Sequence, residues 1–362
     1  MQSEIGSLFP VTDYRDTQDI HRNTMDGIHL YSLCREALLN IAQNYSGERR
    51  VILLPAYTCQ SVVAPFAQEN WEISFYSIDT SLCIDSKSFL SLLYSVNPGV
   101  VLFHPYYGKK LNIKEINILI EAKNKGVMIV QDLTQSIFSE KSNVYSDITV
   151  GSIRKWTGIP DGGFLAINNG VDLEITEPND YYSAFTKPQL DAMYLRGEYF
   201  RTGKKEYKEI SIRLNKYAEK LVDNQLIGFH KISNYTFEAL INIDIDMIKS
   251  KRNENFKTLL NLIKSNEQAS PVFNTVDELD SAPIYFPLYV ENREKFQRLL
   301  AEDNIYAPVL WKVEDNSVIV DESVEYIYKH LLAIPIDQRY SFDDMKRIAD
   351  VINEICCKLE DQ

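Results

Sequence analysis

The sequence predicts an α/β protein, with a mainly parallel sheet flanked by helices in a large domain and a small C-terminal α+β domain. Continuously apolar runs at residues 51–54, 100–103 and 127–130, and a further strand-like run at 73–78, alternate with amphipathic helical segments. The 362 residues also exceed what one small domain usually needs. We therefore expect a large domain over residues 1–245 and a small domain over residues 246–362.

Helical periodicity separates the expected strands. Apolar residues recur at three- and four-residue steps from residue 27, and this pattern predicts a first helix that the polar stretch after residue 42 closes. Further helices are expected over residues 60–68, 86–94, 112–125 and 293–303. A long helical region is expected over residues 187–224, and another helical tract is expected to end near residue 264. Residues 265–281 are expected to be a polar linker, residues 283–290 a strand, and Ser341 the start of the last helix.

Composition excludes several classes of function. The net charge of −13 argues against non-specific nucleic-acid binding, which needs lysine and arginine on phosphates. No run of about 20 apolar residues predicts a membrane span, and no start resembles a signal peptide. The five cysteines form no CxxC pair, which favours a reducing compartment, and we expect a cytoplasmic protein. The five histidines lack close metal spacing, so no metal is expected.

One lysine stands in an unusual setting. Lys155 lies in GSIRKWTGIPDGGFLAI, residues 151–167, beside a glycine-rich turn and between short apolar strand-like runs. A lysine is ordinarily a solvated surface residue, and that alternative stays open. A partly desolvated lysine is instead a good nucleophile toward a carbonyl. We hypothesise that Lys155 forms a Schiff base with pyridoxal 5'-phosphate (PLP).

An Asp-x-x-Gln element stands upstream of this lysine. Asp132 ends the apolar run VMIVQD, and Gln135 follows three residues later. In parallel sheets ligands bind beyond the carboxyl ends of the strands, which is where both residues fall. Asp132 is expected to pair with the pyridinium nitrogen and keep the ring an electron sink, and Gln135 to point its amide at the ring hydroxyl. The alternative for Asp132 is a helix cap.

Other residues are candidates for the phosphate and the ring. Ser152, three residues before the lysine, is expected to donate to the phosphate or else to bond its own backbone. Cys34, Arg35 and Glu36 lie early in the first helix, where backbone amides form an anion site to which Arg35 adds charge. Arg35 has an alternative as a surface partner of Glu36 or Glu48. Tyr57 is expected to stack on the ring or to be a packing residue.

Together these segments resemble the DegT/StrS-type sugar aminotransferases, a group of fold-type I PLP enzymes. The resemblance runs over nearly the whole chain in order, and its segments are LPAYTCQSVV, HPYYG, VQDLTQS, the lysine segment and ISNYTFEAL. It implies a seven-stranded-type sheet, PLP as cofactor, a keto-sugar and an amino-acid donor as substrates, and the roles given above to Lys155, Asp132, Gln135 and Tyr57. It also implies that Asn234 reaches the phosphate of a neighbouring subunit, which requires a homodimer with shared active sites.

Two segments depart from the family pattern. Its usual Ser-Gly-Thr is replaced here by Leu33, Cys34 and Arg35, followed by Glu36. Its usual serine five residues before the lysine is Val150 here, and Ser152 is expected to take its place.

These observations give one main hypothesis and two alternatives. The main one is a PLP-dependent aminotransferase that moves an amino group, with glutamate as donor, to a nucleotide-linked keto-sugar for surface polysaccharide or amino-sugar biosynthesis. The first alternative is a PLP enzyme of another type, such as an elimination. The second is a non-catalytic PLP-fold protein that acts as a ligand sensor or assembly partner. Arg339 is expected either to contact a substrate carboxylate or to brace the small domain.

Overall fold

The computed structural model describes residues 4–11, 27–139, 145–168, 170–223, 226–313 and 318–360. Within them, a seven-stranded sheet has the order β1-β7-β6-β5-β4-β2-β3. Its strands are β1 (Ile28–Tyr31), β2 (Val51–Pro55), β3 (Glu72–Tyr76), β4 (Val100–Phe103), β5 (Met128–Asp132), β6 (Ile148–Ser152) and β7 (Gly163–Ile167). The five strands from β6 to β3 pair in parallel, and only β7 and β1 run antiparallel to their neighbours. The predicted mainly parallel sheet is therefore confirmed.

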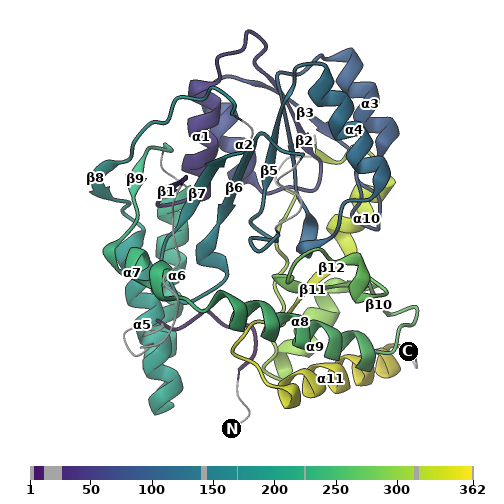
Figure 1. Cartoon of the computed structure of the whole chain (residues 1–362). Coiled ribbons are helices and arrows are strands. Elements are labelled where there is room, and N and C mark those ends of the chain that lie inside the picture. The colour runs from purple at the N-terminus through teal and green to yellow at the C-terminus, as the bar shows by residue number, and fades with distance from the viewer. Residues whose placement is uncertain are drawn as a thin grey trace.

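Helices cover both faces of this sheet, as Figure 1 shows. Alternate residues of each strand point to opposite faces. Val100 of β4 packs in one apolar cluster with α1 (Cys34–Asn44) and α2 (Gln60–Gln68). Val101 packs in the other cluster with α3 (Ser86–Ser95) and α4 (Ile113–Asn124). Burial on both faces explains why these strands read as continuous apolar runs in the sequence.

A second layer of structure follows in the chain. An antiparallel sheet has the order β10 (Ala269–Pro271), β11 (Tyr285–Val290) and β12 (Leu331–Pro335). Helices α8 (Ile245–Leu262), α9 (Arg293–Glu302), α10 (Glu322–His330) and α11 (Phe342–Glu360) accompany it. The proposed division between residues 245 and 246 falls at the start of α8 and stays a prediction. Apolar residues of both sheets belong to one continuous cluster, so the two layers are packed together.

A helical hairpin projects from the large sheet in Figure 1. It consists of α5 (Thr186–Thr202) and α6 (Lys205–Asp223). The long helical region predicted over 187–224 is therefore divided into two helices. Gly203, with φ 71°, ends α5 in a left-handed conformation that glycine adopts without steric cost. After the hairpin come the short strand β9 (His230–Lys231), which pairs with β8 (Asn179–Tyr182), and helix α7 (Asn234–Asn242).

Three further differences from the sequence-based expectation have local causes. Residues 28–31 are strand β1 rather than helix, because they pair with β7. The expected linker contains β10, which pairs with β11. Helix α10 was not expected at all, although Asp321 caps it by accepting a hydrogen bond from the Val324 amide at 3.0 Å. The predicted start of the last helix is confirmed, since Ser341 and Asp344 bond each other reciprocally.

No described helix combines the length and the apolar character that crossing a membrane requires. The described residues also contain no cluster of three or more histidine, cysteine or acidic side chains that could hold a metal ion.

Gly163 generates the first testable prediction. A Cβ added there would lie 2.2 Å from the Cys34 nitrogen, at the start of α1. We expect Gly163→Ala to lower the free energy of unfolding by about 1–3 kcal/mol, the usual cost of overpacking. Gly197 in α5 is a matched control, because its added Cβ would meet only Pro10, at 3.5 Å. Gly197→Ala is expected to be neutral or to stabilise by up to ~1 kcal/mol. Urea unfolding measures both variants, and equal stability of the two would contradict the close approach.

Candidate active site

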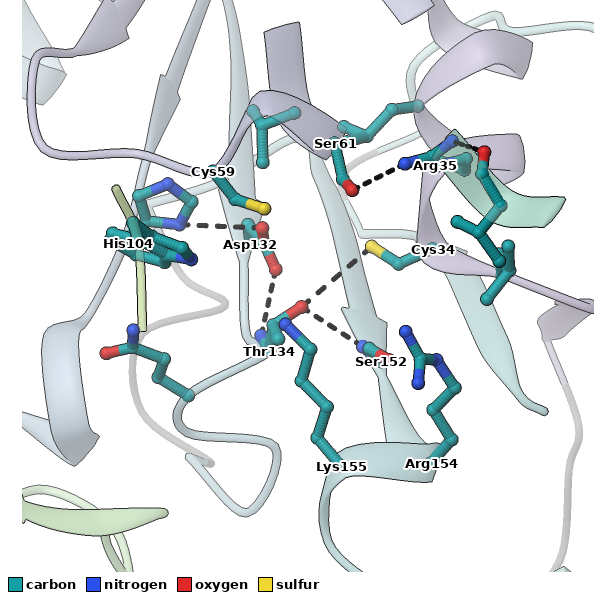
Figure 2. A pocket seen from close by; sticks show the side chains of 16 residues that line it. Cys34, Arg35, Cys59, Ser61, His104, Asp132, Thr134, Ser152, Arg154 and Lys155 are labelled. Atoms are coloured by element: carbon teal, nitrogen blue, oxygen red, sulfur yellow. Dashed lines mark hydrogen bonds and ion pairs between the residues drawn. The ribbon is translucent and has the colours of Figure 1, made fainter. Parts of the chain in front are cut away.

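A pocket lies at the carboxyl ends of the parallel strands, where β2, β4, β5 and β6 face the N-terminus of α1 (Figure 2). It brings together six of the nine residues that the sequence proposed for the site. These are Cys34, Arg35, Asp132, Gln135, Ser152 and Lys155. The position agrees with the rule that ligands of such sheets bind beyond the strand ends.

Asp132 and His104 form the acidic side of the pocket. Asp132 is 3% exposed at the end of β5, and its Oδ1 accepts a hydrogen bond from the Thr134 amide at 2.8 Å. Its Oδ2 lies 3.5 Å from Nδ1 of His104, which follows β4. Burial lowers the pKa of His104, and the nearby carboxylate opposes that shift only in part. We assign the ring proton to Nδ1, so that Nε2 accepts from the Thr58 hydroxyl at 2.9 Å.

Gln135 is held by its carbonyl, and its amide nitrogen has no partner in the described part of the chain. Its Oε1 accepts a hydrogen bond from the Tyr107 amide at 3.0 Å. Tyr107 has a left-handed backbone, with φ 52°, at the turn that follows His104. Gln135 is only 4% exposed, and its Nε2 has no hydrogen-bond partner among the described residues. A buried donor without a partner is costly, so it marks a place where a ligand acceptor fits.

Lys155 projects into the middle of the pocket from a short 3₁₀ turn, Ile153–Lys155, at the end of β6. Figure 2 shows its amine beside Thr134, between Asp132 and Arg154. The next residue, Trp156, is buried and its indole N–H donates to the Thr134 carbonyl at 2.9 Å. The turn that carries Lys155 is therefore tied to the loop that follows Asp132.

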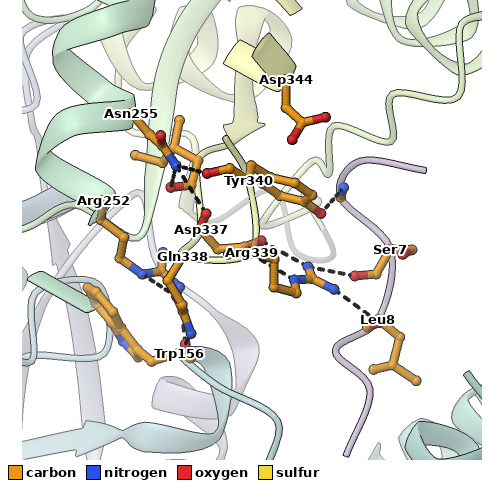
Figure 3. Close-up of polar contacts among 12 residues, drawn as sticks. Ser7, Leu8, Trp156, Arg252, Asn255, Asp337, Gln338, Arg339, Tyr340 and Asp344 are labelled. Atoms are coloured by element: carbon orange, nitrogen blue, oxygen red, sulfur yellow. Dashed lines mark hydrogen bonds and ion pairs between the residues drawn. The ribbon is translucent and has the colours of Figure 1, made fainter. Parts of the chain in front are cut away.

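A polar network fastens the same turn from behind (Figure 3). The Trp156 carbonyl accepts hydrogen bonds from Arg252 of α8 at 3.1 Å and from Gln338 at 2.9 Å. Burial lowers the pKa of the Arg252 guanidinium to about 10. Arg339 binds Asp337 through two hydrogen bonds and donates to the carbonyls of Ser7 and Leu8. These contacts correspond to bracing, and Arg339 does not line the pocket.

Two arginines form the basic side of the pocket. Arg35 of α1 donates to the Val222 carbonyl at 2.6 Å and to the Ser61 hydroxyl at 2.7 Å. Arg154, which precedes Lys155, points toward the start of α1 in Figure 2. Its Nε is buried and has no hydrogen-bond partner in the described part of the chain. Cys34 and Ser152 lie between the two sides, joined through Thr134, whose Oγ1 donates to the Cys34 sulfur at 3.9 Å and accepts from the Ser152 amide at 3.1 Å.

Three residues proposed from the sequence do not line this pocket. Tyr57 is buried behind it, with its ring centroid 4.5 Å from that of Trp311, so its stacking role stays a prediction. Glu36 is buried too, and its carboxylate accepts from the His230 amide at 3.0 Å and lies 2.9 Å from the His230 ring. Asn234 begins α7 on the surface and accepts from the Tyr182 hydroxyl at 3.1 Å. Its proposed reach to a second subunit stays a prediction.

The pocket residues that the sequence analysis did not propose include His104, Thr134, Arg154 and Trp311. Two of them had a usable signal, because His104 follows a strand run directly and Arg154 stands beside the lysine. Thr134 lies inside the Asp-x-x-Gln element, but its role depends on its contacts. Trp311 comes from a distant loop and had no local signal. The tilted rings of His104 and Trp311, 5.6 Å apart, stand at this pocket where Tyr57 was expected.

Comparisons with known proteins support the fold. No protein-family model and no curated protein matches the chain. Among solved structures, the chain is similar to Helicobacter pylori PseC, an aminotransferase involved in the biosynthesis of pseudoaminic acid. That match has a TM-score of 0.67 at 14% identity, over 97% of this chain and 99% of the other.

Two further structures give the same result. One is NtdA from Bacillus subtilis with bound cofactor PMP, at TM-score 0.64 and 14% identity over 96% of this chain and 78% of that one. The other is a DegT DnrJ EryC1 StrS aminotransferase from Brucella abortus, at TM-score 0.61 and 14% identity over 91% and 85% of the two chains. The fold-type I prediction is thereby confirmed: this chain has the fold of the DegT/StrS-type aminotransferases.

Proposed function

We propose that the protein is a PLP-dependent aminotransferase acting on a sugar. The observation that carries this proposal is the placement of one amine, Lys155, between a buried carboxylate, Asp132, and a pair of guanidinium groups in one pocket. PLP has the complementary layout, with a basic ring nitrogen, an aldehyde and a phosphate. The similar structures supply independent support, since PseC and the Brucella abortus protein are aminotransferases and NtdA holds the cofactor PMP.

The residues present fit the cofactor on chemical grounds. Asp132 would hold the ring nitrogen in its protonated form, with His104 supporting the carboxylate from 3.5 Å. The free Nε2 of Gln135 would donate to the ring hydroxyl. Lys155 would hold the aldehyde carbon through its amine. When bound, PLP supplies an electron sink that makes the α-hydrogen of an amino acid acidic.

Lys155 would do the proton chemistry of the reaction. Its Nζ, once released by an incoming amine, can accept a proton from a substrate carbon and return it to a neighbouring position. The Trp156 indole and the contacts behind it hold the lysine turn in place, which keeps this amine oriented during the transfer. The negative charge of Asp132 would remain fixed throughout, because Thr134 and His104 hold it.

The substrates are proposed at a finer level. We take glutamate as the amino donor and a nucleotide-linked keto-sugar as the acceptor, in surface polysaccharide or amino-sugar biosynthesis. The sugar-biosynthetic role in the printed name of PseC supports the acceptor class. We also propose a cytoplasmic homodimer in which Asn234 of one subunit faces the phosphate of the other.

Lys155→Ala tests the proposal most directly. We expect loss of the yellow colour with PLP, loss of the borohydride-fixed adduct on peptide mapping, and a fall in transamination of about 10²- to 10⁴-fold. Lys187→Ala is the control, because Lys187 is an exposed lysine on α5. A Lys155→Ala protein that transaminates at the wild-type rate would contradict the proposal. A wild-type protein that takes up no PLP would instead favour the non-catalytic sensor or assembly alternative.

Asp132→Asn separates cofactor binding from catalysis. The amide keeps the shape of the carboxylate but not its charge, so we expect Lys155 still to capture PLP. The rate of the half-reaction with glutamate, per bound cofactor, should fall by about 10²- to 10³-fold. Asp147→Asn is a buried control outside the pocket, since Asp147 pairs with Lys123 at 2.7 Å. That variant should lose stability but keep its rate, and equal rates in both variants would remove Asp132 from the chemistry.

Product analysis distinguishes the remaining alternative. An aminotransferase returns 2-oxoglutarate from glutamate in proportion to the amino-sugar formed. A PLP enzyme of the elimination type would instead release ammonia or lose a substituent from the sugar. Either result would leave the role of Lys155 intact.

A further inference from the structure

We propose that Arg35 and Arg154 form a two-guanidinium clamp that holds the phosphate group of PLP, an inference that rests on the function proposed above. The two arginines come from separate elements, the first turn of α1 and the turn of Lys155. Both line the same pocket as Lys155. In Figure 2 both lie on the side of the pocket across from His104 and Asp132.

The structure leaves donors of this clamp available. Arg35 donates one hydrogen bond to the Val222 carbonyl and one to the Ser61 hydroxyl, and these two bonds fix its orientation. The Arg154 guanidinium lies 5.9 Å from the centroid of the Phe185 ring, and its buried Nε has no hydrogen-bond partner among the described residues. A guanidinium carries five N–H donors in a rigid plane, a geometry that suits phosphate oxygens.

The charges around the clamp also call for an anion. Burial lowers the pKa of Arg154, and the neighbouring positive charge of Arg35 lowers it further. The carboxylates of Glu219 and Asp161 raise the pKa of Arg154, and that of Asp223 raises the pKa of Arg35. None of these three carboxylates lines the pocket. Arg35 and Arg154 are half-buried and repel each other, and Asp132, the carboxylate among the described residues that line the pocket, is already engaged by the Thr134 amide and faces His104. The two arginines therefore call for a counter-ion of their own. A phosphate dianion would supply that counter-ion.

Neighbouring positions offer few other donors for this role. Val150, five residues before the lysine, is fully buried in the apolar cluster that contains α1. The first residues of α1 provide backbone amides, and Ser61 and Ser152 provide hydroxyls. These groups are neutral, so the arginines would carry the charge-dependent part of the affinity for the phosphate.

The test compares PLP with pyridoxal, which lacks the phosphate, in wild type and Arg154→Met. Dissociation constants are measured from the visible absorbance of the Lys155 adduct and from quenching of tryptophan fluorescence. We expect the constant for PLP to rise about tenfold or more in Arg154→Met, and the constant for pyridoxal to change less than twofold. Arg154→Lys, which keeps a charge but not the fork, should recover part of the loss.

One control variant and one further test variant accompany this measurement. Arg298→Met removes an exposed arginine on α9 and should leave both constants unchanged. Arg35→Met should also weaken PLP binding, but it removes two bonds that fix α1, so its thermal unfolding is measured first. A folded Arg154→Met protein that binds PLP as tightly as wild type would overturn the clamp while leaving Lys155 and the aminotransferase proposal intact.

Inorganic phosphate separates failure of the clamp from failure of the proposed function. Calorimetric titration of the cofactor-free protein with phosphate should show binding in wild type that is lost in Arg154→Met. Phosphate binding of this kind, with no PLP adduct on Lys155, would overturn the proposed function but support a phosphate site at the two arginines. Absence of phosphate binding together with equal PLP and pyridoxal affinities would overturn the clamp.

Discussion

The site depends on how the backbone of Trp156 is held. This residue follows Lys155 directly, and its side chain and its carbonyl are anchored in different directions. The indole binds the loop after Asp132, while the carbonyl binds Arg252 and Gln338 from the C-terminal part of the chain. The Arg252 guanidinium also lies over the indole ring, 4.7 Å from its centroid. Because one residue joins three segments, the relative position of the lysine and the carboxylate does not depend on a flexible loop.

The pocket separates opposite charges across a short distance. Its acidic side is set by a strand end, where Asp132 accepts a backbone hydrogen bond and faces His104. Its basic side is set by a helix start and by the lysine turn. Charges on both sides act on a ligand more strongly inside a protein pocket than they would in bulk water. Such a pocket selects a ligand that is positive at one end and strongly negative at the other.

The sequence predicted the fold well where burial is two-sided. Strands β2, β4 and β5 are apolar on both faces, and this left a continuous run that could be recognised. Strand β1 escaped recognition because its four residues share a helical spacing with those that follow, and only pairing with β7 distinguishes them. Strand β10 is three residues long and depends on β11 for the same reason. In each case the deciding hydrogen bonds come from residues far away in the chain.

The candidate site was likewise predictable only in part. Lys155, Asp132 and Gln135 stand at strand ends within recognisable segments, and the structure brings them into one pocket. Trp311 could not be predicted, because it approaches from a loop between α9 and α10. Glu36 illustrates the opposite error. It was grouped with its neighbours at the start of α1, but a helix turns by about 100° per residue, and the carboxylate instead faces His230.

The presence of Arg35 at the helix start has a physical consequence for the whole pocket. A site built from amides and hydroxyls is neutral when empty, so its groups do not repel one another before the ligand binds. Two half-buried guanidinium groups in one pocket repel each other, and a bound dianion would relieve that repulsion. The same protein carries a net charge of −13, so an anion approaching from solvent meets repulsion until it enters this local positive region. Discrimination in favour of a phosphate ester over a neutral analogue would therefore arise inside the pocket, after entry, rather than from attraction by the surface.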